Sequence, residues 1–305
     1  MSTAQPVRLD GAVDAGGHAA PVHARICQRD LPLAAALSKG PCALAVITQV
    51  VGASYRPLGA VMVVDAQGRR FGNLSSGCIE SDVALHAVAA MADGRIRRLR
   101  YGAGSPFLDL QLPCGGGLDI MILPAPDRSA LAQAADRLAR RQVAKLDLGD
   151  ILLTIEPELR VLIFGKGPET RALSQLAAAA GYEVQTFSPD PETLDGLASA
   201  QLLAHAAWPR GIEPDRRTAV ALFFHDHDWE PPLLEVALES QAFYVGAQGS
   251  LRAHQNRCAV LQARGMDAEQ VGRMAAPFGL IPSLRDPQSL AVSVLAQLLE
   301  RSAKI

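Results

Sequence analysis

The segment from residue 160 to 189, RVLIFGKGPETRALSQLAAAAGYEVQTFSP, constrains the fold more than any other part of the chain. It reads as an apolar strand, a turn with Gly165 and Gly167, a helical pattern closed by a glycine, and a second strand. The same alternation of strand and helix recurs between residues 218 and 265. Neighbouring parallel strands need a long crossover, usually a helix, so the alternation predicts a Rossmann-like domain with a parallel sheet.

The first half of the chain lacks that alternation. Apolar, β-branched runs predict strands over 42–51 and 118–124, and helical spacing runs from Gly77 to Gly94 and over 129–142. We therefore predict an α/β fold class, in which an N-terminal mixed α+β domain precedes the Rossmann-like domain. The expected boundaries are a mobile leader over 1–25, a first domain over 26–150 and a second domain over 158–305, with a charge-rich stretch between the domains.

Composition narrows the class of partner and the compartment. The formal net charge of the 305-residue chain is -2, which favours neither nucleic acid nor an anionic membrane as a partner. The 5 cysteines are widely spaced and form no CxxC pair, so we expect neither a disulfide framework nor a structural zinc site. No apolar run is long enough for a signal peptide or a membrane span. We therefore expect a protein of the reducing cytoplasm.

Gly165 and Gly167 follow a predicted strand and open a helix, as in a dinucleotide-binding turn. The third glycine of GxGxxG is replaced by Thr170, and the acid expected at the end of the next strand is replaced by Ser188, with Asp190 two positions later. The turn could still offer N–H groups to an anion, or its glycines could only let the helix pack on the strand. We keep Gly165 and Gly167 as candidate cofactor contacts and do not expect NAD to be the ligand.

Two further predicted strands end in polar or small residues. His225 follows the strand TAVALFF, and Gly246 and Ser250 lie in YVGAQGS, just before a helix. Open α/β sheets bind ligands at the carboxyl ends of their strands, so these three residues are candidate cofactor contacts. His225 and His227 could share a face, but no third ligand has a suitable spacing, and we predict no metal site.

Cys78 lies in the stretch SSGCIESD, which we expect to open a helix. In the first turn of a helix the macrodipole favours a thiolate. Gly77 would then be the N-cap, and Glu80 could reach back to its N–H group as half of a capping box. The plainer interpretation is a small buried cysteine at a helix start with Glu80 as a cap.

Cys114 stands directly before Gly115, Gly116 and Gly117 in LPCGGG. Three successive glycines permit positive φ angles, a close approach of the backbone, or a nest of N–H groups that faces an anion. A tight structural turn is the alternative interpretation. The pattern favours a role for Cys114 in ligand binding or sulfur chemistry.

These motifs together resemble the XdhC/CoxI family. The resemblance covers about residues 30–302, and it is carried by GASYRPLGAVMVV, GNLSSGCIESDV and LDLQLPCGGGLDIMILP in the first half, and by RVLIFGKGPETRALSQLAAAAGYEV, YVGAQGSLRAHQNR and RMAAPFGLIP in the second. This chain has Tyr55 where the family usually has proline, and Ser76 where it usually has glycine. It also has GPE in place of a His-containing turn after GxG, and Ser188-Pro189-Asp190 in place of Asp-Pro-Arg.

The resemblance implies a maturation factor for molybdenum hydroxylases such as xanthine dehydrogenase and carbon monoxide dehydrogenase, with no catalytic residues of its own. Such a protein would bind molybdenum cofactor as molybdopterin, assist its sulfuration with a cysteine desulfurase, and deliver it to the apo molybdenum hydroxylase; a homodimer also remains open. The implied contacts in the first half are Arg56, Ser76, Gly77, Cys78, Glu80, Cys114, Gly115, Gly116 and Gly117. We hypothesise that Cys78 and Cys114 face one cleft, with Arg56 supplying positive charge for the phosphate.

Three other functions stay open at this point. An NAD(P)-dependent oxidoreductase would use the second domain, although the ribose-binding acid is missing from its expected place. An enzyme with a thiol nucleophile at Cys78 or Cys114 would need a base, and His86 lies two turns from Cys78 in the predicted helix. A scaffold that binds only the target dehydrogenase would have no affinity for the cofactor.

Overall fold

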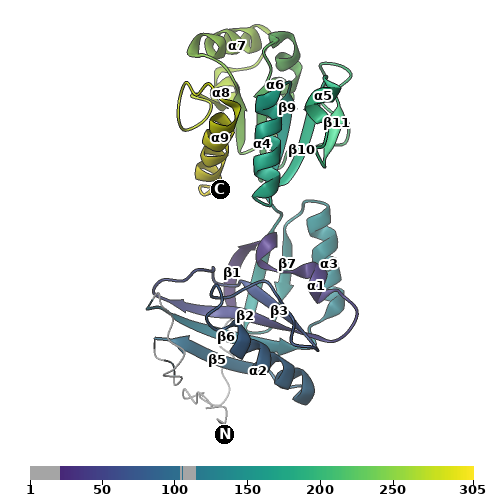
Figure 1. Ribbon diagram of the computed structural model, residues 1–305, viewed down its shortest axis with the longest axis vertical. Coiled ribbons are helices and arrows are strands. Elements are labelled where there is room, and N and C mark those ends of the chain that lie inside the picture. Colours follow the sequence, from purple (N-terminus) through teal and green to yellow (C-terminus); the bar gives the residue numbers. More distant parts are fainter. Residues whose placement is uncertain (1–20, 104, 106–114) are drawn as a thin grey trace. The chain divides into compact units, whose positions relative to one another are not determined.

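The computed structural model describes residues 21–103, residue 105 and residues 115–305 (Figure 1). The described residues up to Pro157 form one compact unit, and Glu158–Ile305 form a second. No helix in the described part of the chain is long and apolar enough to cross a membrane.

The first unit is built on a five-stranded antiparallel sheet in the order β4-β3-β2-β6-β5. The central strand β2 contributes residues that are buried on both faces, as its continuous apolar sequence CALAVI predicts. The strands are β2 (Cys42–Val51), β3 (Val61–Asp65), β4 (Arg70–Phe71), β5 (Arg97–Gly102) and β6 (Gly117–Pro124).

A second, three-stranded sheet in this unit corrects the sequence analysis at two places. The strand β1 (Val22–Cys27) pairs with β8 (Ile151–Glu156), which pairs in turn with β7 (Ala144–Asp147). Residues 22–25 therefore begin a strand instead of ending a leader, and the charge-rich stretch after residue 143 is a β-hairpin. Each strand alternates buried apolar residues with more accessible ones, and such short, half-buried strands give a weak pattern in the sequence.

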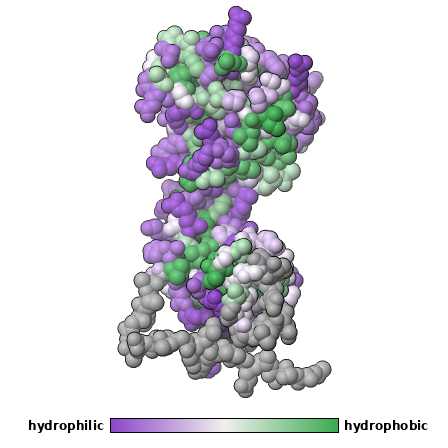
Figure 2. All heavy atoms as spheres, turned by 90° about the vertical axis from the view of Figure 1, so that its left-hand side faces the viewer, coloured by the Kyte–Doolittle hydropathy of each residue, from purple (hydrophilic) through white to green (hydrophobic). Residues whose placement is uncertain are grey.

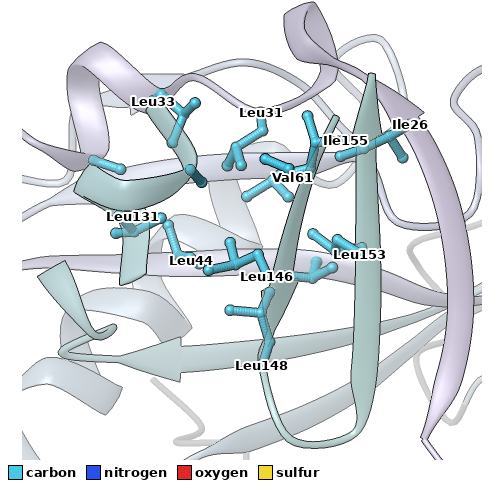
Figure 3. Packing of buried hydrophobic residues seen from close by; sticks show 14 of the residues in the cluster. Ile26, Leu31, Leu33, Leu44, Val61, Leu131, Leu146, Leu148, Leu153 and Ile155 are labelled. Atoms are coloured by element: carbon cyan, nitrogen blue, oxygen red, sulfur yellow. The ribbon is translucent and has the colours of Figure 1, made fainter. Parts of the chain in front are cut away.

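The main core of the first unit lies between its two sheets (Figure 3). Leu44 and Val61 from the five-stranded sheet pack with Leu146 and Leu153 from the three-stranded sheet. The short helix α1 (Leu33–Ala36) and the helix α3 (Arg128–Ala139) close the edge of this core.

The helix α2 (Glu80–Asp93) covers the other face of the five-stranded sheet (Figure 1). It packs there through Val83 and through alanines, whose small side chains let the helix approach the strands closely. The helix ends at Gly94, which has a φ of 69° in the left-handed region, as the sequence predicts.

The second unit is a Rossmann-like domain, so the predicted fold class is confirmed. Its six strands are all parallel, in the order β11-β10-β9-β12-β13-β14, and the order of the strands reverses between β9 and β12. The strands are β9 (Arg160–Gly165), β10 (Glu183–Ser188), β11 (Ala200–Leu202), β12 (Thr218–Phe223), β13 (Tyr244–Ala247) and β14 (Met274–Ala275).

Helices cover both faces of this parallel sheet, as the alternating sequence predicts. One face packs against α4 and α9, and the other against α6, α7 and α8. Figure 2 shows that the visible surface of the second unit is largely polar with an apolar area among the polar atoms. The helices are α4 (Pro168–Ala179), α5 (Pro191–Leu194), α6 (Glu230–Glu239), α7 (Leu251–Ala263), α8 (Ala268–Gly272) and α9 (Pro287–Ser302).

Candidate functional site

Several loops of the first unit carry the sequence motifs described above, and we call them the motif loops. Three of them meet at one end of the five-stranded sheet. The last residue of β2, Val51, is paired with Gly117, and Gly117 is also paired with Gly102 at the end of β5. The N–H group of Ala103 donates to the carbonyl of Gly116 at 3.0 Å. The chain after β2, the chain after β5 and the chain before β6 are therefore neighbours.

Two of the three glycines of LPCGGG are required by the backbone packing at this end. A Cβ atom on Gly116 would lie 2.2 Å from the carbonyl oxygen of Ala53, and one on Gly117 would lie 2.9 Å from the carbonyl oxygen of Ala103. Gly115 has open space around it but a φ of 69°, which favours glycine. Backbone packing thus accounts for Gly116 and Gly117, and the positive φ angle accounts for Gly115. Cys114 lies outside the described residues.

The loop of residues 74–79 is wrapped around the carboxylate of Glu80, which is buried. One oxygen of Glu80 accepts from the N–H groups of Leu74 and Ser75, at 2.9 and 2.7 Å. The other oxygen accepts from the hydroxyl of Ser75 and from the N–H groups of Gly77 and Ile79. Burial would raise the pKa of Glu80, but these donors outweigh burial and lower it below its usual value.

The same loop is joined to the glycine end of the sheet. The hydroxyl of Tyr101, which precedes Gly102 in β5, donates to the carboxylate of Asp82 in the first turn of α2 at 2.6 Å. Burial and this carboxylate raise the pKa of Tyr101, so its hydroxyl stays protonated as a donor. The loop that contains Ser76, Gly77 and Cys78 therefore lies at the end of the sheet where the other motif loops meet.

The position of Cys78 differs from the expected one. The helix begins at Glu80 with Ile79 as the N-cap, so Cys78 precedes the helix, and it is exposed. The helix starts later because Glu80 binds the N–H groups of the preceding loop, in which Ser76 and Gly77 have φ angles of 62° and 110°. The reach of Glu80 back to the N–H group of Gly77, at 2.9 Å, is confirmed.

Alternate backbone N–H groups of this loop remain available to a ligand. Glu80 engages Leu74, Ser75, Gly77 and Ile79, whereas the N–H groups of Ser76 and Cys78 meet no acceptor within the described part of the chain. Both of these residues are exposed. The loop thus presents two N–H donors and a thiol at one end of the sheet, a combination suited to an anionic ligand.

Arg56 lies in the loop that follows β2, and it forms an ion pair with Asp30. Its Nη2 donates to Oδ1 of Asp30 at 2.6 Å, and Asp30 also accepts from the N–H group of Cys27 at 3.0 Å. The Nε atom of Arg56 is buried and meets no acceptor in the described residues. The guanidinium therefore keeps one donor that a bound anion could use.

The glycine turn of the second unit is tied to the chain beyond β10. The N–H group of Gly167 donates to the hydroxyl of Thr193 at 2.9 Å, and that hydroxyl donates to the carboxylate of Asp190 at 2.6 Å. Pro168 follows without an N–H group, and one carboxylate oxygen of Glu169 is buried beside the turn. A pyrophosphate at this turn would meet carboxylates and few free donors.

Gly165 and Gly246 have close-packing roles. A Cβ atom on Gly165 would lie 2.5 Å from the hydroxyl oxygen of Thr170 and 2.6 Å from the carbonyl oxygen of Phe223. A Cβ atom on Gly246 would lie 2.7 Å from the ring of Phe278. Gly165 lets α4 pack closely against the end of β9, and Gly246 lets the loop that contains Phe278 pack against β13. For Gly165 this is the alternative interpretation of the glycine turn, in which the glycine serves packing.

His225 and Ser250 are exposed near the carboxyl ends of β12 and β13. Ser250 is the N-cap of α7, and its hydroxyl accepts from the N–H group of Ala253 at 3.2 Å. Within the residues that the structure describes, no group of three or more metal-ligating side chains is clustered.

Comparison with known proteins places these observations in a family. The XdhC and CoxI family model matches residues 35–102, and the model of the XdhC Rossmann domain matches residues 161–298. The chain is 35% identical over 274 residues to the molybdenum cofactor insertion chaperone PaoD of Escherichia coli, with 83% of this chain and 81% of that protein covered. The chain belongs to the XdhC and CoxI family.

Other members and structures extend the comparison. A protein of Bacillus subtilis described as a probable subunit of xanthine dehydrogenase is 25% identical, with 86% of this chain and 93% of that protein covered. The crystal structure of a xanthine dehydrogenase from Bacillus halodurans has a TM-score of 0.71, with 89% of this chain and 94% of that chain covered. At 21% identity this last likeness concerns the fold alone.

Two polar pairs in the XdhC Rossmann domain of this chain escaped the sequence analysis. Arg257 of α7 binds Glu230 of α6 through Nε and Nη2, at 2.7 and 2.9 Å, and both residues are buried. His254 and Cys258 are in contact on α7, with 3.5 Å between Nε2 and Sγ. The HxxxC spacing of the second pair was a visible signal, whereas the first pair joins residues far apart in the sequence.

The His254–Cys258 pair is neutral. Burial raises the pKa of the Cys258 thiol and lowers the pKa of His254, and Arg257 lowers the pKa of His254 further. Both shifts oppose the thiolate and imidazolium forms that an activated cysteine requires. A nucleophilic role for this pair is therefore disfavoured.

Replacing Glu80 with glutamine should destabilise the first unit by about 2–3 kcal/mol at pH 7, because an amide nitrogen would face N–H donors. The folded-state pKa of Glu80 is lowered, so its stabilisation is complete above the unfolded-state pKa and is lost as the pH falls through the folded-state value. Urea unfolding at pH 7 and in acid measures both effects. The exposed Glu239→Gln variant is the control, and an equal loss at both pH values would contradict this account.

Proposed function

We propose that this member of the XdhC and CoxI family binds molybdenum cofactor, assists its sulfuration by a cysteine desulfurase, and delivers it to an apo molybdenum hydroxylase. The observation that carries the proposal is the 35% identity to the insertion chaperone PaoD across 83% of the chain. The convergence of the family's motif loops at one end of the five-stranded sheet supports it. The chain would act as a carrier and not as an enzyme.

The chemistry of the motif loops fits an anionic cargo with a phosphate group. The N–H groups of Ser76 and Cys78 and the Nε atom of Arg56 are donors that meet no acceptor in the described residues. Donors of this kind bind phosphate oxygens, and charged donors bind them most strongly. Cys78 adds an exposed thiol in the same loop as the first two donors, and thiolates are suitable ligands for a soft metal centre.

The second unit would contribute acceptors instead of donors. The Oε2 atom of Glu169 and the Oε1 atom of Gln248 are buried without a hydrogen-bond partner in the described residues. Both residues follow strands of the parallel sheet, β9 and β13. Amino and ring N–H groups of a pterin could satisfy such acceptors, so a pterin that contacts the second unit would do so through these two residues.

Titration of the purified protein with molybdenum cofactor tests this function. Saturable binding is expected, and Cys78→Ala and Cys114→Ala should each weaken it by about tenfold, or ~1.4 kcal/mol. Cys258→Ala removes a thiol from the second unit and serves as the matched control, for which no change is expected. Circular dichroism verifies that each variant is folded.

An NADH titration run in parallel tests the competing oxidoreductase. Binding of NADH without binding of molybdenum cofactor would overturn the proposal. Cofactor binding that neither cysteine variant weakens would retain the carrier function but would exclude the two motif cysteines from the site. Sulfur transfer from a cysteine desulfurase to the bound cofactor, measured as activation of an apo molybdenum hydroxylase, tests the later steps.

A further inference from the structure

The helix α2 carries apolar residues on the side that faces away from the sheet as well as on the side that packs against it. Its outward residues Leu85, Val88, Ala89 and Ala92 are exposed, and they recur at the spacing of one helix face. We call these four residues the α2 stripe. Leu85 is 72% exposed and Val88 is 37% exposed. Exposed apolar residues gathered on one helix face mark interaction surfaces, so the α2 stripe indicates a docking surface.

A cation stands at each end of the α2 stripe. Near the start of the helix, Arg70 of β4 donates to the hydroxyl of Ser81 at 2.8 Å. At the other end, Arg95 directly follows Gly94, where the helix stops. The N–H group of Arg95 donates to the carboxylate of Asp93 at 3.0 Å, but neither guanidinium forms an ion pair in the described part of the chain. The surface is therefore apolar in the middle and positive at both ends.

The nearby carboxylates do not neutralise these two arginines. Asp82 accepts the hydroxyl of Tyr101 at 2.6 Å, and Asp93 is paired with Arg97 at 2.7 Å. Asp82 also lies 3.6 Å from Nε2 of His86 on α2, and Asp93 also accepts from the N–H group of Arg95, but neither carboxylate pairs with the guanidinium of Arg70 or Arg95. Arg70 and Arg95 remain the groups that a docked partner could neutralise.

The charges argue against a second copy of this chain as the occupant. In an antiparallel pairing of two α2 helices, Arg70 of each copy would face Arg95 of the other, and in a parallel pairing each arginine would face its equivalent. Like charges across a contact are unfavourable in either arrangement. The α2 stripe is also small, because one leucine, one valine and two alanines fall short of the roughly 800 Å² per partner that a stable dimer buries.

We propose that the α2 stripe is where the client enzyme docks, through an apolar segment with acidic residues at both ends. This inference rests on the proposed function, because it concerns the protein that would receive the cargo. The loop of residues 74–79 leads directly into α2, and Glu80 holds that loop and begins the helix. A client on the α2 stripe therefore lies beside the donors of Ser76 and Cys78, and a small contact suits a partner that binds and leaves.

The test uses three variants of the full chain and apo xanthine dehydrogenase as the probe. Leu85→Glu places a charge in the α2 stripe, and the double variant Arg70→Glu with Arg95→Glu reverses the charge at both ends. Leu202→Glu is the control, because Leu202 is 53% exposed and lies in the second unit. Affinity for the apo-enzyme, affinity for molybdenum cofactor and the rate of enzyme activation are measured for each variant.

We expect both stripe variants to bind the apo-enzyme about tenfold more weakly or worse, as for a central residue of an interface, with unchanged cofactor affinity. The control should match the parent chain. Unchanged binding of the apo-enzyme by both stripe variants would overturn the inference while leaving the proposed function intact. A parent chain that binds neither cofactor nor apo-enzyme would instead contradict the proposed function.

Light scattering tests whether a second copy of this chain binds to the α2 stripe. The parent chain is expected to be a monomer or to have the same oligomeric state as Leu85→Glu. A parent dimer that Leu85→Glu converts to a monomer would show that the α2 stripe joins two copies of this chain, and would overturn its assignment to a client.

Discussion

Alanine at position 116 is expected to lower the free energy of unfolding of the first unit by about 3–5 kcal/mol, at the upper end of single-substitution effects. The added Cβ atom would lie 2.2 Å from the carbonyl oxygen of Ala53 and 2.9 Å from that of Val51. Both are backbone atoms, so neither can move aside by changing a side-chain rotamer. The two chain segments would have to separate at the end of the sheet where the motif loops meet.

The neighbouring Gly115 provides the matched control for this prediction. Gly115→Ala meets open space, so only its positive φ opposes the substitution, at a cost of about 1–2 kcal/mol. Chemical unfolding of both variants measures the difference, and cofactor affinity is expected to fall more for Gly116→Ala. Equal stability losses would show that the contact with Ala53 does not constrain the loop.

Replacing Arg257 with methionine should lower the free energy of unfolding of the second unit by about 3–5 kcal/mol, because Glu230 would keep a buried charge without the guanidinium that binds it. The residue pair is 5% and 1% exposed, and Arg257 also donates to the carbonyl of Gln248. The substitution therefore releases both α6 and the end of β13. Thermal and chemical unfolding of the second unit report the loss.

Two further variants separate the buried pair from a general effect of losing an arginine. Arg264→Met breaks the more exposed pair with Glu235 between the same two helices, and a change of at most about 1 kcal/mol is expected. Glu230→Gln combined with Arg257→Met removes both charges, and should be less destabilising than Arg257→Met alone. If the double variant is the less stable one, burial of an unpaired charge is not the cause.

The sequence predicted the parallel sheet of the second unit well, because the evidence for it is local. The central strands β9 and β12 are almost entirely apolar and fully buried, and the helices between Pro168 and Ala263 have their own periodicity. The strands of the three-stranded sheet were missed because they are short and half-buried, and because β1 pairs with a strand more than a hundred residues later. Pairing at that distance leaves no mark on either segment alone.

At the candidate site, the sequence indicated which residues were unusual but not what each one contacts. Glu80 was identified as a possible cap of one N–H group, and the structure shows that it binds four N–H groups and a hydroxyl. Arg56 was expected to supply positive charge for the phosphate, and the structure shows that it is paired with Asp30. Burial and hydrogen bonding of a charged group depend on the whole chain around it, so local patterns could not determine them.

The sequence by itself determined the order of the two units, the class of each fold and the motifs that mark the family, because periodicity and glycine positions are properties of short segments. Only the tertiary structure decided that Gly116 packs against the chain after β2, that Cys78 lies outside its helix, and that α2 presents the α2 stripe. Each of these depends on contacts between segments far apart in the chain. The physical reason is that close packing and desolvation are set by which surfaces meet.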